Sequence, residues 1–162
     1  MKKRWGIALA LTVSGSAFAI IIGGGGSLPG TMTGGGSILS NGIRVTHGFE
    51  LNCDSTQVPQ SLEINFDSGH QFHLDRLNTA FCYNDPNIHA SPGAVGEMNT
   101  YTGTGTGTLD GVPGATVSFL FSDAGEPGTS DVATYTITDA NGKAVLSAVT
   151  GTLTYGNHQA HN

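Results

Sequence analysis

Charged residues, and basic ones above all, are scarce in this sequence. Only 11% of the 162 residues are charged, and six of them are Lys or Arg. Half of these basic residues, at 2–4, precede an apolar run over about 5–13, and residues 17–19 (Ala-Phe-Ala) fit the small-x-small pattern of a signal-peptidase site. The pattern predicts a secretory signal peptide over residues 1–19, whose apolar run is too short to span a bilayer.

The shortage of basic residues argues against nucleic acids as partners. Cleavage after Ala19 leaves 143 residues, with Arg44, Arg76 and Lys143 as the three basic side chains against twelve acidic ones, a formal net charge of −9. Because neutralisation of phosphates by basic groups is the main source of affinity for nucleic acids, nucleic-acid binding is disfavoured. The remainder of the chain contains no second long apolar stretch, so we expect no membrane span after processing.

Cysteine is also rare, with Cys53 and Cys82 alone. Export places the chain in an oxidising compartment, where an even number of cysteines favours a disulfide. Such a bridge would close a loop of about 30 residues and stabilise the fold by about 3–4 kcal/mol in the chain-entropy treatment.

Helical periodicity is absent, whereas short alternating apolar runs separated by turn residues are frequent. Such runs are "IRVTHGFEL", "SLEINF", "ATVSFLF" and "DVATYTIT", and "DANG" at 139–142 is a strong hairpin signal. The pattern predicts an all-β fold, an antiparallel β-sandwich of about eight or nine strands over residues 37–162.

Two glycine-rich stretches need separate interpretation. In "YTGTGTGTLD" the glycines would share one strand face, which is either a ligand groove or a flat surface covered by core aromatics, and we favour the second. Residues 20–36 are expected to form a glycine-rich arm, beginning with Ile20, Ile21 and Ile22. These three residues are predicted to form an assembly strand that docks in a neighbouring subunit, or else to pair with their own sheet.

The motifs of several enzyme classes are missing. The chain lacks HExxH, CxxCH and GxSxG, and its Gly-rich stretches do not join a strand to a helix as phosphate-binding loops do. We therefore expect a protein that is not an enzyme, with a secreted hydrolase as the alternative.

Histidine offers a possible transition-metal site, because imidazole binds zinc and copper. Histidines three apart on a strand point to opposite faces, so neither "HQFH" nor "HQAH" is a ready chelate. A composite site would draw on residues distant in the sequence: His47, His73, His158 and His161. The interpretation that we favour needs no metal: His47 and His73 are hydrogen-bonded sheet residues, and the last two histidines belong to a polar tail.

The stretch "SDAGEPGTSD" at 122–131 is the main acidic feature. Asp123, Glu126 and Asp131 on a bent loop supply the oxygen ligands that calcium prefers, although the EF-hand spacing is absent. A plain turn between two strands accounts for the same stretch without an ion, and we favour it. Calcium binding is the alternative, and calcium is the one cofactor that the sequence suggests.

An ordered string of motifs, "GGGS", "HGFELNCD", "GTGTGT", "DAGEPG" and "GNHQAH", resembles a domain of secreted bacterial surface proteins that often follows choice-of-anchor modules. The resemblance covers roughly residues 34–161 and implies a β-sandwich on the cell surface or in the extracellular matrix. It carries no catalytic residues over to this chain. We expect an exported structural or adhesive protein whose partners are further copies of itself or other surface components, with a secreted metal-binding module as the alternative.

Overall fold

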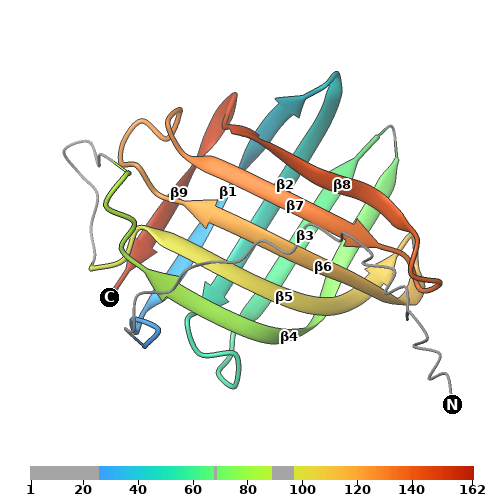
Figure 1. The fold of residues 1–162 in the computed structure, drawn as a ribbon, viewed down its shortest axis with the longest axis horizontal. Helices are drawn as coiled ribbons and strands as arrows, with labels where there is room; N and C mark the ends of the chain where they lie inside the picture. The colour runs from blue at the N-terminus through green and yellow to red at the C-terminus, as the bar shows by residue number, and fades with distance from the viewer. Residues whose placement is uncertain (1–25, 68, 89–96) are drawn as a thin grey trace, which may run out of the picture.

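Nine antiparallel strands form the fold in a computed structural model that describes residues 26–67, 69–88 and 97–162 (Figure 1). The predicted signal peptide and Ile20–Ile22 lie outside this range. Within the described residues, no helix is long and apolar enough to cross a membrane. The strands are β1 (Thr31–Ser40), β2 (Ile43–Asn52), β3 (Gln60–Phe66), β4 (His70–Tyr83), β5 (Thr100–Leu109), β6 (Val112–Ser122), β7 (Val132–Thr138), β8 (Ala144–Thr152) and β9 (Tyr155–His161).

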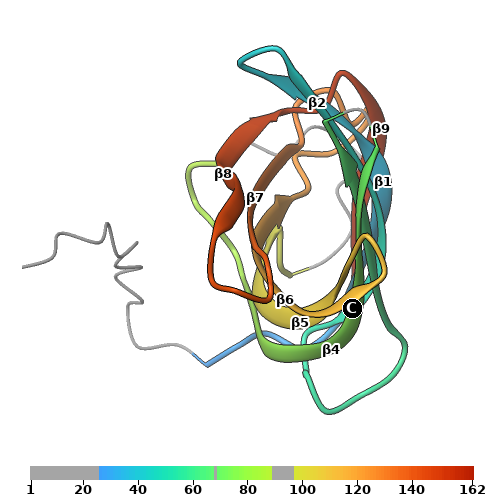
Figure 2. The ribbon, with the colours of Figure 1, turned by 90° about the vertical axis from the view of Figure 1, so that its right-hand side faces the viewer.

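All nine strands belong to one sheet, in the order β8-β7-β6-β5-β4-β3-β2-β1-β9. The all-β class and the strand number are as predicted, but the two separate sheets of a sandwich are replaced by a single sheet curled into a half-barrel (Figure 2). The reason lies in β4, whose first residues pair with β3 while most of its length pairs with β5. Register shifts near Leu74 and Leu77 bend this strand, as β-bulges do.

The glycines of β5 allow the sheet to curl at this point. A Cβ added at Gly107 would lie 2.0 Å from the carbonyl oxygen of His73, and one at Gly105 would lie 2.8 Å from that of Arg76. Glycine therefore lets β4 cross close to β5. The glycine face of "GTGTGT" is packed against neighbouring backbone and core side chains and is not a ligand groove.

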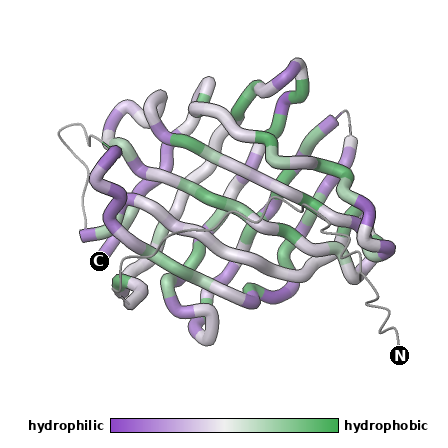
Figure 3. Tube along the Cα trace, viewed as in Figure 1, coloured by the Kyte–Doolittle hydropathy of each residue, from purple (hydrophilic) through white to green (hydrophobic). Residues whose placement is uncertain are grey.

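The core lies inside the curl and is built from the predicted alternating residues. Val45, Phe49 and Leu51 of β2 are buried, as are Leu62, Ile64 and Phe66 of β3. Figure 3 shows hydrophilic residues gathered at turns and near the C-terminus, with apolar and neutral residues along the strands. Alternation along a strand places every second side chain inside, so the remaining side chains form an outer face.

The glycine-rich arm is shorter than predicted, because Thr31–Gly36 belong to β1. The turn that joins β1 to β2 has Asn41 and Gly42 at φ 51° and 81°, the pair of positive values that a tight hairpin needs. Gly34 is required in the strand: a Cβ there would lie 2.9 Å from the His158 ring. Gly34 therefore makes room for β9 and its His158 side chain.

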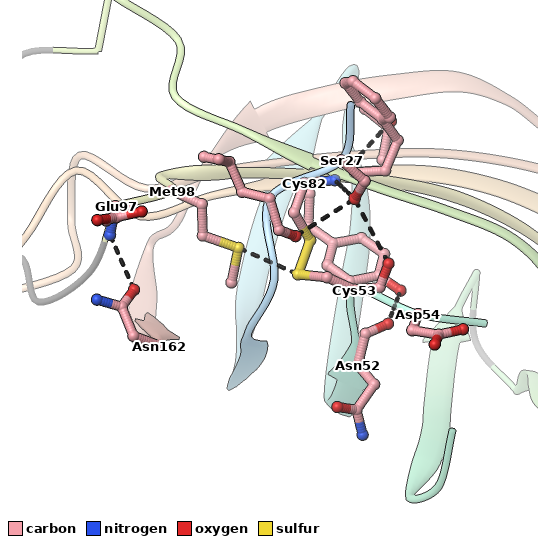
Figure 4. The surroundings of a disulfide bond; sticks show 12 residues. Ser27, Asn52, Cys53, Asp54, Cys82, Glu97, Met98 and Asn162 are labelled. Carbon is pink, nitrogen blue, oxygen red and sulfur yellow. Dashed lines mark hydrogen bonds between the residues drawn. A yellow bond between two sulfur atoms is a disulfide. The ribbon is translucent and has the colours of Figure 1, made fainter. Parts of the chain in front are cut away.

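The predicted disulfide between Cys53 and Cys82 is present (Figure 4). It joins the residue after β2 to β4 at a Cα–Cα distance of 5.6 Å. The segment that enters β1 is held beside it, since the Leu28 amide donates to the Cys82 carbonyl and the Cys53 amide donates to the Gly30 carbonyl. The chain therefore enters the sheet at a covalently fixed point.

Candidate functional site

The acidic loop between β6 and β7 folds back over β9. Asp123 and Asp131 are buried, with 4% and 0% of their surface exposed. Each of their four carboxylate oxygens accepts a hydrogen bond from a backbone amide. Asp123 accepts from Gly125 and Ala160 at 2.8 and 2.9 Å. Asp131 accepts from Ala124 and His158 at 2.7 and 2.8 Å. The two carboxylates are thus committed to hydrogen bonds within the fold.

Two of these amides belong to the outer edge of β9. His158 and Ala160 are two residues apart, so their N–H groups point to the same side, away from β1, the strand with which β9 pairs. Asp131 and Asp123 therefore take the place of a missing neighbouring strand. Glu126, which is exposed, adds two contacts through Oε1, accepting from Asn157 Nδ2 at 2.8 Å and Gln159 Nε2 at 3.2 Å.

Burial changes the protonation of Asp131. Desolvation raises its pKa to about 6, against the opposing effect of the hydrogen bonds donated by the His158 and Ala124 amides. The nearby charges of Asp123 and Glu126 act in the same direction as desolvation. Asp131 consequently takes up a proton at a higher pH than an exposed aspartate.

A chain of three polar side chains crosses the core beside this loop. His47 Nε2 lies 2.7 Å from His158 Nε2, and Tyr135 Oη lies 2.5 Å from His47 Nδ1. His158 Nδ1 lies 2.9 Å from the Ser122 carbonyl oxygen. We call Tyr135, His47 and His158 the imidazole chain; it links β7, β2 and β9, and its members are 0%, 7% and 0% exposed.

One arrangement of protons satisfies every member of the imidazole chain. The Ser122 carbonyl only accepts, so His158 carries its proton on Nδ1 and offers a lone pair on Nε2. His47 then donates from Nε2 to that lone pair, and its Nδ1 accepts the Tyr135 hydroxyl proton. Both imidazoles are neutral in this arrangement.

The surroundings favour the neutral imidazoles. Burial lowers the pKa of His47 to about 3, with a further contribution from His158, and burial lowers the pKa of His158 to about 4. Aromatic rings enclose the pair, with Phe121 stacked on His47 at 5.3 Å and Phe49 stacked on Phe121 at 4.0 Å between centroids. The imidazole chain is a closed polar layer within an apolar core.

The predicted histidine ligands do not converge as a set of four. His47 and His158 meet, but His73 lies on the outer face, 3.7 Å from a Glu63 oxygen, and His161 Nε2 lies 3.0 Å from the Thr33 hydroxyl. Among the described residues, no group of three His, Cys, Asp or Glu side chains is arranged to hold a metal ion. The calcium site at Asp123, Glu126 and Asp131 remains a prediction without geometric support.

Sequence reasoning missed the part played by Tyr135 and Ser122. Alternation correctly places Tyr135 on a strand face with Ala133 and Ile137, yet it does not indicate which strand lies opposite. A tyrosine in an otherwise apolar strand face weakly indicates a polar contact in the core, because a buried hydroxyl requires a hydrogen-bond partner.

The outer face of β2–β4 carries a hollow of about 510 Å³. We call it the outer trough. Its lining includes Thr46 and Gly48 of β2, Glu63 and Asn65 of β3, and His73 of β4. These residues alternate with core residues and so point away from the imidazole chain.

Comparisons with protein families, with characterised proteins and with solved structures gave no match.

Proposed function

We propose that the chain is exported and acts outside the cell as a structural or adhesive protein that is not an enzyme. This proposal rests on one observation: the buried titratable groups that lie close together form hydrogen bonds within the fold. Asp123, Asp131, His47 and His158 are all buried, and each forms hydrogen bonds that hold β9 to the rest of the sheet. Such groups support the fold, whereas general acids, bases and nucleophiles must reach a substrate.

The disulfide supports the extracytoplasmic setting. Stable structural disulfides are typical of secreted and surface proteins, because the cytosol keeps thiols reduced. The Cys53–Cys82 bond is buried, and the same residues anchor the entry of the chain into β1.

Expression of the full chain in a bacterial host tests export. We expect the protein outside the cytoplasm, beginning at Ile20, with a mass lower by two hydrogens than that of the dithiol form. Full retention in the cytoplasm with residues 1–19 attached and two alkylatable thiols would contradict the proposal.

Assembly into filaments is the second part of the proposed function, with Ile20–Ile22 as the donated strand. The acidic loop closes the edge of β9, which leaves β8 as the other terminal strand of the sheet. Ala144, Ser147 and Ala148 of β8 are exposed. A strand added there would gain backbone hydrogen bonds, and a head-to-tail contact of this kind does not close on itself.

Replacement of all three isoleucines by serine tests the assembly. Light scattering and electron microscopy should show filaments of the mature wild type and monomers of the variant. A wild type that stays monomeric at high concentration, or a variant that assembles equally well, would remove the filament from the proposal and leave a monomeric surface protein.

A further inference from the structure

Gly48, at the floor of the outer trough, lacks the structural reason that other strand glycines have. A Cβ added at Gly34, Gly103 or Gly107 would meet another atom at 2.9 Å or less. Among the strand glycines that the structure describes, only Gly48 would gain a Cβ with no atom within 4 Å, and its φ is not positive. Glycine weakens a strand interior and often marks a place where a ligand approaches the backbone.

The space above Gly48 is bordered by an oriented carboxylate. Glu63, directly opposite Gly48 on β3, accepts hydrogen bonds on Oε1 from Asn65 Nδ2 at 2.9 Å and from Gln71 Nε2 at 3.1 Å. These bonds, that of Asn65 first, lower the pKa of Glu63, so the group is ionised at neutral pH. Oε2 faces His73 Nδ1 at 3.7 Å, which is beyond hydrogen-bond distance and leaves this oxygen free to accept from a ligand.

The other lining groups restrict the chemistry of that ligand. Thr46 and Ser61 supply hydroxyls, Asn65 an amide and His73 an imidazole, so the lining offers both donors and acceptors. One carboxylate is too few for a calcium site, and the negative charge disfavours phosphates and other anions.

We propose that the outer trough binds a neutral polysaccharide, with sugar hydroxyls donating to Glu63 and a ring face lying over Gly48. A hydroxyl-rich, uncharged ligand matches this mixture of donors, acceptors and a flat floor. The hollow of about 510 Å³ lies within the range of small-ligand sites, about 300–1,000 Å³. The inference deepens the proposed adhesive function, on which it rests, by naming the class of partner.

Affinity electrophoresis of the folded mature protein tests the proposal, in gels that contain dextran, galactomannan, xylan or the anionic polysaccharide alginate. We expect at least one neutral polysaccharide to retard the wild type and alginate to leave its mobility unchanged. Gly48→Val should abolish the retardation or weaken it at least about tenfold while melting at an equal or higher temperature, because its side chain enters open space and valine favours strands. Glu63→Gln should weaken binding by roughly tenfold to a hundredfold, as loss of a charged hydrogen-bond acceptor does.

Ser118→Val is the matched control, since Ser118 is exposed on β6 and outside the trough. It should bind as the wild type does. Absence of retardation by all three neutral polysaccharides, retardation by alginate alone, or equal binding by the wild type and Gly48→Val would overturn the proposal.

The same samples separate this inference from the proposed function. An exported protein that binds none of the neutral polysaccharides defeats the inference and leaves the structural role intact. Release of reducing ends from a bound polysaccharide would defeat the non-enzymatic role and leave the binding site intact.

Discussion

At the scale of single residues, Tyr135 is the donor at one end of the imidazole chain. Replacing it with Phe removes the proton that His47 Nδ1 accepts and leaves that buried nitrogen without a partner. Because an unsatisfied buried polar group costs about 1–3 kcal/mol, we expect Tyr135→Phe to lower the free energy of unfolding by about this amount.

Urea unfolding of the two tyrosine variants measures this effect. Tyr155 is 55% exposed, so Tyr155→Phe should change stability by no more than about 0.5 kcal/mol. Equal stabilities of Tyr135→Phe and Tyr155→Phe would show that the tyrosine hydroxyl does not support the imidazole chain.

The buried histidines predict a loss of stability in acid. Their pKa values are about 3 and 4 in the fold and 6.5 in the unfolded chain, so between pH 6.5 and 4 the unfolded state binds up to two more protons. Asp131 opposes this, because its pKa of about 6 in the fold exceeds the 3.8 of an aspartate in the unfolded chain, so the folded state binds one more proton. With one net proton taken up on unfolding between about pH 6 and 4, the free energy of unfolding should fall by about 1.4 kcal/mol for each pH unit.

Chemical denaturation at several pH values measures this slope. Asp131→Asn removes the opposing carboxylate, so its stability should fall more steeply with acid, while Glu50→Gln, at an exposed carboxylate on β2, should retain the wild-type slope. A wild-type stability that stays constant or rises from pH 6 to 4 would contradict the assignment of neutral, buried imidazoles.

At the scale of elements, much of the strand content can be predicted. Alternation in "IRVTHGFEL" and "SLEINF" identifies the core faces of β2 and β3, because the two-residue period is a local property. The start of β1 is not predicted, since "TGGGS" resembles a linker by composition. The hairpin pair Asn41-Gly42 is the local signal that indicates a strand on both of its sides.

The close crossing of β4 and β5 can be tested at Gly107 of β5. Gly107→Ala would place a Cβ 2.0 Å from the His73 carbonyl oxygen, a backbone atom that moves only if β4 moves. We expect a loss of about 1–3 kcal/mol, as overpacked cores show, and a lower melting temperature by calorimetry. Gly48→Ala, which meets no atom within 4 Å, is the control and should not lose stability. Equal melting temperatures of the two variants would mean that the close crossing of β4 and β5 does not require glycine.

At the scale of the whole molecule, the sequence does not predict how the sheet closes. The sequence favours a turn over a cation site at Asp123 and Asp131, but it does not predict their contacts with β9. Two partners of these carboxylates, the amides of Ala160 and His158, lie at the far end of the chain. The pairing of His47 with His158 is likewise a contact across 111 residues. Such contacts depend on the curl of the sheet, which arises from bulges and glycines acting together.

The Cys53–Cys82 bond is the one covalent constraint on this arrangement. It joins β2 to β4, strands that have β3 between them in the sheet, and it holds the segment that enters β1. Replacing both cysteines with serine should reduce the free energy of unfolding by about 3–4 kcal/mol, since a loop of 29 residues is released in the unfolded chain. Urea unfolding of oxidised wild type, reduced wild type and the double variant measures the effect, and the last two should agree within about 1 kcal/mol if chain entropy is its main source. A double variant as stable as the oxidised protein would mean that the hydrogen bonds of the acidic loop and the imidazole chain hold the curled sheet without covalent help.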